Sequence, residues 1–460
     1  MKHLYRPLLL SVLLLAGTHA REAYAQDDPS VATTSAAPFL RVAPDARGAG
    51  MGDAGAATPG DVNAAYWNPA KLVFAPGGKG VSLSYAPWLR QAAANMWISQ
   101  LSGFFMPGRN QAVGASLVYF NQGNVSLRDM NRQRTGDFNP REFALTGTYA
   151  LKLSEYASVA GGLKYVYSNL VGSAATGLDG RPAHALAGDV GVFLQTDPGE
   201  LHRLNVAFGT TLANLGTRVN YGTSERYFLP TNLRVGTGVT YRFGEEGRLT
   251  FALDANKLLL PSRPVYDYPD LGPPTLVRGR NPDRDYFSSI FGSFGDSPDR
   301  LAGELKEVGL GGGVELWPNQ YFALRSGYYH ESARDGDRRY FTAGIGIRYN
   351  GLGLDASYLA PQWRNHPLAE TVRLTLTLTP PPRESRNALV YSGNKYAGRS
   401  YGGFGSGTRR SNASRAGHRR HQSSIYRNNG AGRYTKGLRK RQTQRERRTR
   451  QNIRKTRYRR

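Results

Sequence analysis

Stretches of about ten residues with alternating apolar and small or polar side chains constrain this chain's fold more than any other feature. In the clearest stretch, 371–379, the aliphatic residues at 372, 374, 376 and 378 fall on one face, and Arg373 and the threonines fall on the other. Membrane-crossing strands repeat in this way, with apolar side chains toward lipid, although a half-buried strand of a soluble protein does so too. Fourteen such segments are predicted, at 80–90, 94–106, 111–121, 141–151, 156–168, 186–196, 203–214, 231–242, 248–258, 306–317, 320–330, 340–349, 351–360 and 370–379.

The connections between these segments alternate in length. Every second connection is a short turn: 107–110, 152–155, 197–202, 243–247, 318–319 and 350–351. The others are mostly long: 122–140, 169–185, 215–230, 259–305, 331–339 and 361–369, with 91–93 as the exception. Outer-membrane barrels have short periplasmic turns and longer extracellular loops, whereas a β-sandwich has no reason to sort its loops. The predicted fold is therefore all-β: residues 77–380 form a transmembrane antiparallel β-barrel of about 14 strands.

Aromatic residues gather near the ends of the predicted strands, where the interfacial girdles of a membrane barrel belong. The residues assigned to these girdles are Tyr85, Trp88, Tyr119, Phe120, Tyr165, Tyr167, Tyr241, Trp317, Tyr328, Tyr329, Tyr349 and Tyr358.

The first 25 residues have the organisation of a cleavable export signal. Lys2 and Arg6 precede a leucine-rich run, 8–16, and Ala23-Tyr24-Ala25 supplies a small-residue cleavage site. An N-terminal membrane anchor is the alternative, but the run is too short to cross about 30 Å of hydrocarbon. We predict a signal peptide at 1–25 and a linker at 26–37, which places the barrel in the outer membrane.

The positive charge of the chain is concentrated at its C-terminal end. The formal net charge is +26, and residues 381–460 hold 24 Lys and Arg but two acidic residues. Few aliphatic residues and a high net charge predict a disordered tail. Its interleaved arginines and tyrosines resemble an RNA-binding tract. Because the chain is predicted to be exported, we predict no nucleic-acid partner. Strand parity predicts a periplasmic tail that binds anionic lipid headgroups or an acidic partner.

Residues 38–76, before the first strand, are predicted to plug the barrel, because fourteen strands enclose a lumen that needs filling. Gly50-x-Gly52-x-x-Gly55 matches a dinucleotide-binding pattern, but it lacks the strand before and the helix after that the motif requires. Small residues instead allow tight backbone packing in a crowded lumen. The candidate plug residues in the lumen are Trp67, Asn68, Pro69 and Ala70.

Several strings in the chain resemble known outer-membrane proteins. Residues 54–57 with Asn68-Pro69-Ala70 are similar to the N-terminal signature of the FadL-type superfamily. Longer strings at 39–47, 66–71 and 82–89 resemble the PorV (LptO) family of the type IX secretion system of Bacteroidota, as do shorter ones at 256–259, 290–294, 327–331 and 366–371.

The resemblance to PorV implies a function in protein secretion. Such a barrel is expected to bind the C-terminal signal domain of secreted cargo at a large translocon barrel (SprA/Sov-like). It would then pass the cargo to a cell-surface attachment complex with a PorU-like sortase. The alternative class is a FadL-like transporter of hydrophobic small molecules across the outer membrane. Outer-membrane lipid is a partner in both cases.

Residues with catalytic chemistry do not cluster in the sequence. There is no cysteine, and none of the eight histidines has the spacing of a metal site. No G-x-S-x-G element is present outside the glycine-rich tail. A lipid A deacylase activity has been associated with the resembled family, but no residue set here would carry it. We predict a binding protein without catalytic residues, cofactor or metal.

The longest connection, 259–305, is expected to be functional, because loops of this length are uncommon. Tyr286, Phe287, Ile290, Phe291 and Phe294 recur near helical spacing. A second helix is predicted to start at Ser297-Pro298-Asp299, with Ser297 as its N-cap, and to run toward Val308. The apolar stripe either caps the barrel or forms an exposed anchor for a partner.

Overall fold

The computed structural model describes residues 35–88, 95–128, 131–170, 181–196, 203–222, 226–244, 246–262, 265–267, 275–278, 285–297, 300–332, 336–363, 368–369 and 371–380. The chain divides into two units, 1–385 and 386–460, and all described residues belong to the first. The predicted signal peptide, most of the predicted linker and the predicted basic tail lie outside the described residues.

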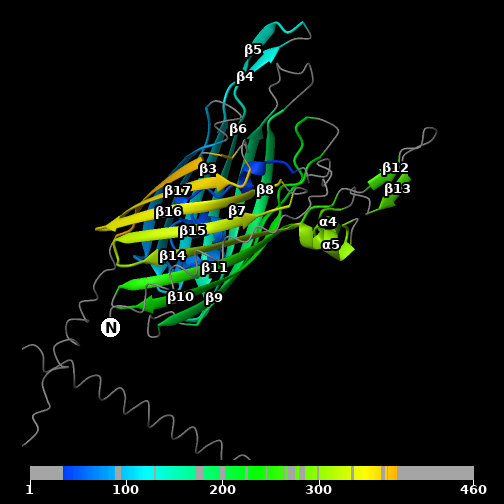
Figure 1. The fold of residues 1–460 in the computed structure, drawn as a ribbon. Helices are drawn as coiled ribbons and strands as arrows, with labels where there is room; N and C mark the ends of the chain where they lie inside the picture. The colour runs from blue at the N-terminus through cyan, green and yellow to red at the C-terminus, as the bar shows by residue number, and fades with distance from the viewer. Residues whose placement is uncertain are drawn as a thin grey trace, which may run out of the picture. The chain divides into compact units, whose positions relative to one another are not determined.

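Fourteen antiparallel strands close into one barrel, which confirms the predicted fold (Figure 1). Each strand pairs with its neighbours in chain order, and β1 closes the barrel against β18, with Leu83 opposite Leu376. The strands are β1 (Lys79–Pro87), β2 (Met96–Gly108), β3 (Gln111–Gln122), β6 (Arg141–Lys152), β7 (Ala157–Asn169), β8 (Ala183–Gln195), β9 (Leu204–Gly216), β10 (Asn232–Phe243), β11 (Gly247–Leu258), β14 (Val308–Trp317), β15 (Phe322–His330), β16 (Arg339–Tyr349), β17 (Leu352–Pro361) and β18 (Thr371–Leu378).

Side chains alternate along each strand between a face toward lipid and a face toward the lumen, as β18 shows. Leu374 and Leu376 are about half exposed on the outside, whereas Arg373 and Thr375 are buried inside. The short connections meet at one end of the barrel and the long ones at the other. We call these the turn end and the loop end; in an outer membrane the loop end faces the cell exterior.

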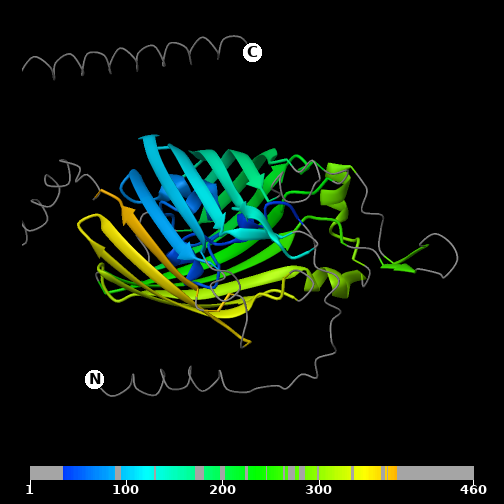
Figure 2. The same ribbon diagram turned by 90° about the horizontal axis from the view of Figure 1, so that it is seen from above.

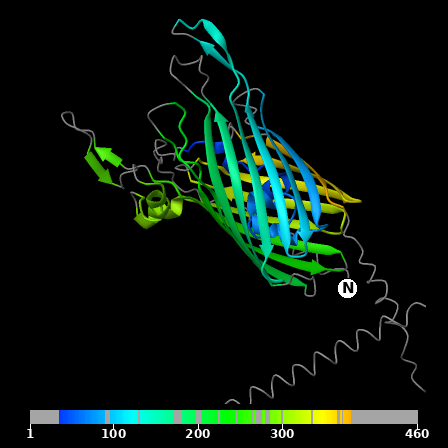
Figure 3. The ribbon, with the colours of Figure 1, turned by 180° about the vertical axis from the view of Figure 1, so that it is seen from behind.

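The long connections contain secondary structure of their own. Two hairpins were not predicted: β4 (Val125–Arg128) with β5 (Arg134–Phe138), and β12 (Val265–Asp267) with β13 (Thr275–Arg278). The first hairpin projects from the barrel, as seen from behind in Figure 3. The two helices predicted in the longest connection are present as α4 (Tyr286–Gly292) and α5 (Arg300–Lys306).

The predicted N-cap of the second helix is wrong. Helix α5 is described from Arg300, three residues beyond Ser297, while Pro298 and Asp299 lie outside the described residues. The backbone N–H of Ser297 donates to Glu304 Oε1 at 3.0 Å, so this residue is tied to the helix from outside its first turn.

Residues 35–76, the lumen segment, lie inside the barrel (Figures 1 and 2). They form η2 (Pro38–Arg41), α2 (Ala46–Ala49), α3 (Ala64–Trp67) and η3 (Pro69–Phe74). Glycines of the wall admit this backbone closely. A Cβ at Gly313 would lie 2.3 Å from Met51 O, and one at Gly209 would lie 2.1 Å from Ala56 O. Gly209 and Gly313 therefore mark two points where the segment touches the wall.

Most of the predicted girdle aromatics do face outward near a strand end. On the lipid face at the loop end, Trp97 lies 6.0 Å from Tyr85 and 5.3 Å from Tyr119 between ring centres. No described helix is both long and apolar enough to cross a membrane.

Four of the twelve residues assigned to the girdles face the lumen instead: Trp88, Phe120, Trp317 and Tyr329 are buried. Phe120 and Tyr329 each follow another aromatic residue, and because sides alternate along a strand, one member of each pair must point inward. Phe120 stacks on Phe39 of the lumen segment, with ring centres 6.4 Å apart.

Candidate functional site

The structure places Trp67 in the middle of the lumen segment, where its indole is buried. Its Nε1–H donates to Asp45 Oδ1 at 2.6 Å, and the other carboxylate oxygen accepts from Gly48 N at 2.9 Å as the N-cap of α2. Gly48 and Gly55 lie against the ring, because a Cβ at either position would come within 2.5 Å of an indole atom. Of the Gly50-x-Gly52-x-x-Gly55 pattern, Gly55 thus lies against the tryptophan, and Gly52 lies against the backbone of Gly312 and Tyr328 in the wall.

Asn68, Pro69 and Ala70 form the link between α3 and η3. The Asn68 side chain accepts from Ala70 N, so that it caps η3, and Pro69 occupies the first position of that helix. The Nδ2 of Asn68 donates to Val192 O of β8 at 2.9 Å and to Ala56 O at 3.2 Å. Ala70 is fully buried, and its carbonyl accepts from Ser158 of β7. The Asn68-Pro69-Ala70 string therefore caps η3 and also attaches the lumen segment to β7 and β8 of the barrel wall.

A chain of buried ion pairs ties the lumen segment to the wall near the turn end. Arg47 of α2 donates through Nε and Nη2 to the two oxygens of Glu315, at 2.9 and 2.8 Å, and through Nη1 to Asp61. Glu315 also accepts from Arg325, which donates to Asp355 at 2.9 Å. A bidentate guanidinium–carboxylate pair fixes orientation as well as position, so α2 is held in one register.

Asp254 of β11 and Lys71 of η3 hold the loop between α2 and α3. One oxygen of Asp254 accepts from Gly55 N at 2.7 Å and from Ala56 N at 2.8 Å. The Lys71 ammonium donates to Gly55 O and to Thr58 Oγ1. Burial lowers the pKa of Lys71 to about 8, so the lysine is held by hydrogen bonds to neutral oxygens at a site that disfavours its charge.

The ionisation of Asp45 is also disfavoured. Burial and then the nearby Asp61 carboxylate raise its pKa to about 6, against the hydrogen bonds from Gly48 and Trp67. A raised carboxyl pKa in the folded state stabilises the fold below the unfolded pKa, and this stabilisation is lost as the pH rises through the folded pKa.

Asp45→Asn is therefore expected to gain stability relative to the native chain between pH 4 and pH 7. A pKa difference of about two units corresponds to about 3 kcal/mol over this window. Urea unfolding of both proteins in lipid vesicles across the pH range measures the difference. A free-energy difference that does not change with pH would contradict the buried, charge-disfavouring site.

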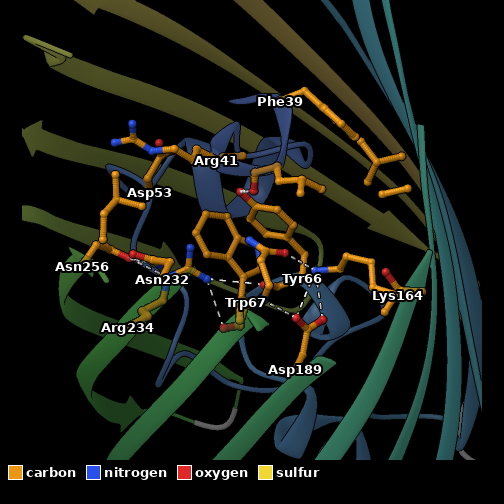
Figure 4. Close-up of a pocket in the computed structure, with 18 of the residues that line it drawn as sticks. Phe39, Arg41, Asp53, Tyr66, Trp67, Lys164, Asp189, Asn232, Arg234 and Asn256 are labelled. Atoms are coloured by element: carbon orange, nitrogen blue, oxygen red, sulfur yellow. Dashed lines mark hydrogen bonds and ion pairs between the residues drawn. The ribbon is translucent and has the colours of Figure 1, made fainter. Parts of the chain in front are cut away.

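A cavity of about 70 Å³ lies between the lumen segment and the wall toward the loop end (Figure 4). Its lining combines charged and amide side chains with apolar and aromatic ones, such as Leu40, Val118 and Trp67. Lys164 is paired with Asp189 at 3.0 Å, and Arg41 and Arg338 are both paired with Glu331. Burial alone would raise the pKa of Glu331, but the two guanidinium groups hold it below its usual range.

Arg234 is the cation of this cavity that has no carboxylate within ion-pair distance among the described residues. Its guanidinium lies 4.8 Å from the Trp67 ring centre and donates to Asn256 Oδ1 and to Trp67 O. Figure 4 shows it pointing toward the Trp67 ring. The cavity thus presents a cation beside the aromatic ring of Trp67.

A second and larger space, about 1170 Å³, opens at the turn end. Its wall includes Arg47, Trp317 and Arg348, together with the last described residues, Thr379 and Pro380. The lumen segment separates this vestibule from the cavity at the loop end.

The candidate partner-binding residues at 286–294 divide into two sets. Tyr286 and Ile290 pack inward: the Tyr286 hydroxyl accepts from Gly216 N at 2.7 Å, and Ile290 is 4% exposed. Phe287, Phe291 and Phe294 are 68%, 75% and 51% exposed, and Leu301 and Leu305 of α5 add further exposed apolar surface. We call these five side chains the helical apolar patch.

Helix α5 is held to the barrel by ion pairs. Lys257 of β11 lies at a lipid-facing position of the strand alternation, and its ammonium is within 2.8 Å of both Glu304 and Glu307. Helix α5 is therefore attached to the outer side of β11 at the loop end, and Figure 2 shows both helices at that end of the barrel. Both alternatives for the stripe stay predictions, because Tyr286 and Ile290 pack against the barrel while the three phenylalanines are exposed.

Several residues that build the lumen site were not predicted, among them Asp45, Arg47 and Asp254. Each belongs to a segment or strand whose place was predicted, but the partners are more than a hundred residues apart in most cases. The sequence signal that could have identified such residues is a charged residue at a lumen-facing position of a strand, such as Glu315. Within the described residues, no group of three or more His, Asp or Glu side chains could hold a metal ion.

A closed 14-strand barrel with lipid-facing aliphatic residues and a polar, filled lumen defines an outer-membrane β-barrel protein. Residues 24–265, more than half of the chain, match the family described as "Type IX secretion system protein PorV". The chain belongs to the PorV family and is thus an outer-membrane component of the type IX secretion system.

Solved structures of similar fold share little sequence with this chain. The Pseudomonas putida toluene transporter TodX is 13% identical, with a TM-score of 0.42 over 72% of this chain and 97% of its own. A Pseudomonas aeruginosa FadL homologue is 13% identical, with a TM-score of 0.39 over 73% and 98% of the two chains. A search of curated proteins found no match.

Proposed function

We propose that this barrel binds the C-terminal signal domain of secreted cargo at the translocon and carries it to the cell-surface attachment complex. Membership of the PorV family supports a role in type IX secretion. The observation that carries the finer assignment is the helical apolar patch, a set of exposed aromatic and leucine side chains on a module anchored beside the loop end. Large exposed apolar patches are typical of protein-binding surfaces.

The partners of this function are a translocon barrel of SprA/Sov type, the cargo signal domains, a PorU-like sortase complex and outer-membrane lipid. Protein partners of this kind require an extended binding surface rather than a pore. Aromatic side chains carry much of the binding energy in such interfaces. The exported barrel offers no reason to expect a nucleic-acid partner, and we propose binding rather than catalysis as its activity.

Transport of hydrophobic small molecules, the alternative function, is less well supported. A FadL-like transporter needs an apolar path from the loop end to the periplasm. Here the lining of the cavity beside the lumen segment includes the charged residues Lys164, Asp189, Arg234 and Glu331 among apolar ones. An apolar solute would displace hydration from these groups without replacing it, which is unfavourable.

Deletion of the protein tests the secretion function. Cells without it are expected to retain cargo with C-terminal signal domains, and the native chain supplied in trans is expected to restore release. Fractionation of cells and medium measures both. Normal secretion from the deletion strain would refute the proposal.

Substitution of the patch tests the binding surface. Phe287→Ser, Phe291→Ser and Phe294→Ser together are expected to leave barrel assembly intact, because all three side chains are exposed. They are expected to weaken co-purification of translocon or cargo at least about tenfold, since buried aromatic anchors each contribute more than about 1 kcal/mol to an interface.

Leu276→Ser with Val277→Ser is the matched control, because these exposed apolar residues lie in the same connection but on β13. The control is expected to bind as the native chain does. Equal binding by the triple variant and the control would show that the patch is not the partner surface. Ile290→Ser is unsuitable for this purpose, because that side chain is buried.

A further inference from the structure

A row of aromatic side chains lies on the lipid face of β6, β7 and β8 toward the loop end. Phe143, Tyr167 and His184 stand opposite one another across the three strands. Tyr167 stacks on Phe143, with ring centres 5.0 Å apart, and meets the His184 imidazole edge-on at 5.3 Å. Because Glu142 and Ser168, their neighbours in the chain, are buried on the lumen side, the row faces lipid.

Polarity changes along this face toward the loop end. On the turn-end side of the row, the lipid-facing residues Leu145, Leu163 and Leu186 are exposed, as expected of a surface in hydrocarbon. On the loop-end side, Arg141 begins β6 and stands opposite Asn169 of β7 on the same face. The aromatic row therefore lies at the boundary between hydrocarbon and headgroups of the outer leaflet, and Arg141 lies at the level of the headgroups.

Arg141 and His184 both offer hydrogen-bond donors at this boundary. The Nδ1 atom of His184 lies 2.6 Å from the Tyr165 hydroxyl, which holds the ring and leaves Nε2 directed away from that tyrosine. Both side chains are exposed, and neither the Arg141 guanidinium nor Nε2 of His184 has a hydrogen-bond or ion-pair partner among the described residues. The side-chain oxygen of Asn169 also has no partner there.

We propose that Arg141 and His184 bind a phosphate group of an outer-leaflet lipid, whose acyl chains pack along the leucines of β6–β8. A guanidinium binds phosphate through two nitrogens in one plane, and such charge-assisted hydrogen bonds are strong. The imidazole N–H donates to the same phosphate from a strand two places away. One lipid is thus held at a defined place on the wall, whereas bulk lipid exchanges around the barrel.

Another aromatic group on the lipid face at the loop end lacks these donors. It consists of Tyr85, Trp97 and Tyr119 on β1–β3. The next outward positions toward the loop end on β1 and β3 are Pro87 and Asn121, which have no charge. An interfacial girdle therefore accounts for the group on β1–β3, whereas the group on β6–β8 adds a cation that attracts an anionic headgroup.

Native mass spectrometry of the purified barrel in detergent counts the lipids that stay bound. The probe is a synthetic glycolipid with one phosphate on its disaccharide headgroup, and the comparison lipid is the same glycolipid without phosphate. The native barrel is expected to bind the phosphorylated lipid at least about tenfold more tightly. Arg141→Ala and His184→Ala are each expected to remove most of this preference, and Arg141→Lys to keep part of it, because a lysine retains the charge but not the planar fork.

Lys79→Ala is the matched control, because Lys79 is also exposed on the lipid face but at the turn end of β1. This variant is expected to keep the native preference. Equal binding of the two glycolipids by the native barrel, or equal losses in Arg141→Ala and Lys79→Ala, would overturn the proposal.

Inorganic phosphate distinguishes a lipid from a free anion. If phosphate alone displaced the glycolipid completely, the site would bind a free anion, and the proposal of a lipid would be wrong. Arg141→Gln, which keeps the length of the side chain without its charge, repeats the measurement should Arg141→Ala not assemble. Cargo is absent from the assay, so its result stands separately from the proposed function.

Discussion

A chain that lacks residues 38–76 is expected to form a leaky and much less stable barrel, if it assembles at all. The deletion removes the part of the chain that separates the vestibule of about 1170 Å³ from the cavity at the loop end. It also removes the ion pair of Arg47 with Glu315 and both backbone N–H groups that donate to Asp254. These two buried carboxylates then lose hydrogen-bond donors. Breaking one buried ion pair costs about 3–5 kcal/mol, so the loss of stability exceeds that figure.

Sensitivity of cells to large antibiotics and the heat stability of the purified barrel measure this expectation. A leaky lumen admits antibiotics that the native strain excludes. If exclusion and heat stability both remained at the native level, the proposal that residues 38–76 act as a plug would be wrong, although they lie in the lumen.

Arg47→Ala is expected to destabilise the barrel by about 3–5 kcal/mol without changing its length or fold. The guanidinium binds Glu315 through two nitrogens and Asp61 through the third. Burial opposes its charge, but Glu315 and Asp61 together hold the pKa of Arg47 well above its usual value. The arginine is therefore always charged, and its loss leaves Glu315 with Arg325 as its described partner.

Arg134→Ala is the matched control, because Arg134 also pairs with a carboxylate, that of Asp137, but on the exposed β4–β5 hairpin. Exposed ion pairs contribute little to stability, and the urea midpoint of this variant is expected to equal that of the native barrel. Similar midpoints for Arg47→Ala and Arg134→Ala would argue that the lumen segment is only loosely held.

The barrel could be predicted from the sequence because its signal is local. A strand between lipid and lumen alternates with a period of two, and this is visible in any single segment, such as Thr371–Leu378. The largest displacement of a predicted strand start is at β8, which begins at Ala183 rather than at residue 186. The hairpin β4–β5 was missed because its strands are short and exposed on both sides, so that no face is consistently apolar.

The lumen site was predicted in outline rather than in detail. Trp67 and Asn68 stood out as a large aromatic residue and a capping residue beside a proline. Their partners did not, because the Asp45 carboxylate is 22 residues away in the chain and the Val192 carbonyl is 124 away. Phe120 and Tyr329 were assigned to the lipid face because position near a strand end does not say to which side a residue points.

The sequence by itself determined the number of strands, the faces of the sheet and the end at which the long connections lie, since each of these follows from local periodicity and connection length. Only the tertiary structure decided how the lumen is filled and that helix α5 is attached to the outer side of β11. These depend on contacts such as those between Arg47 and Glu315, 268 residues apart. Pairings of this kind are selected by burial and charge within a closed barrel, which no local pattern records.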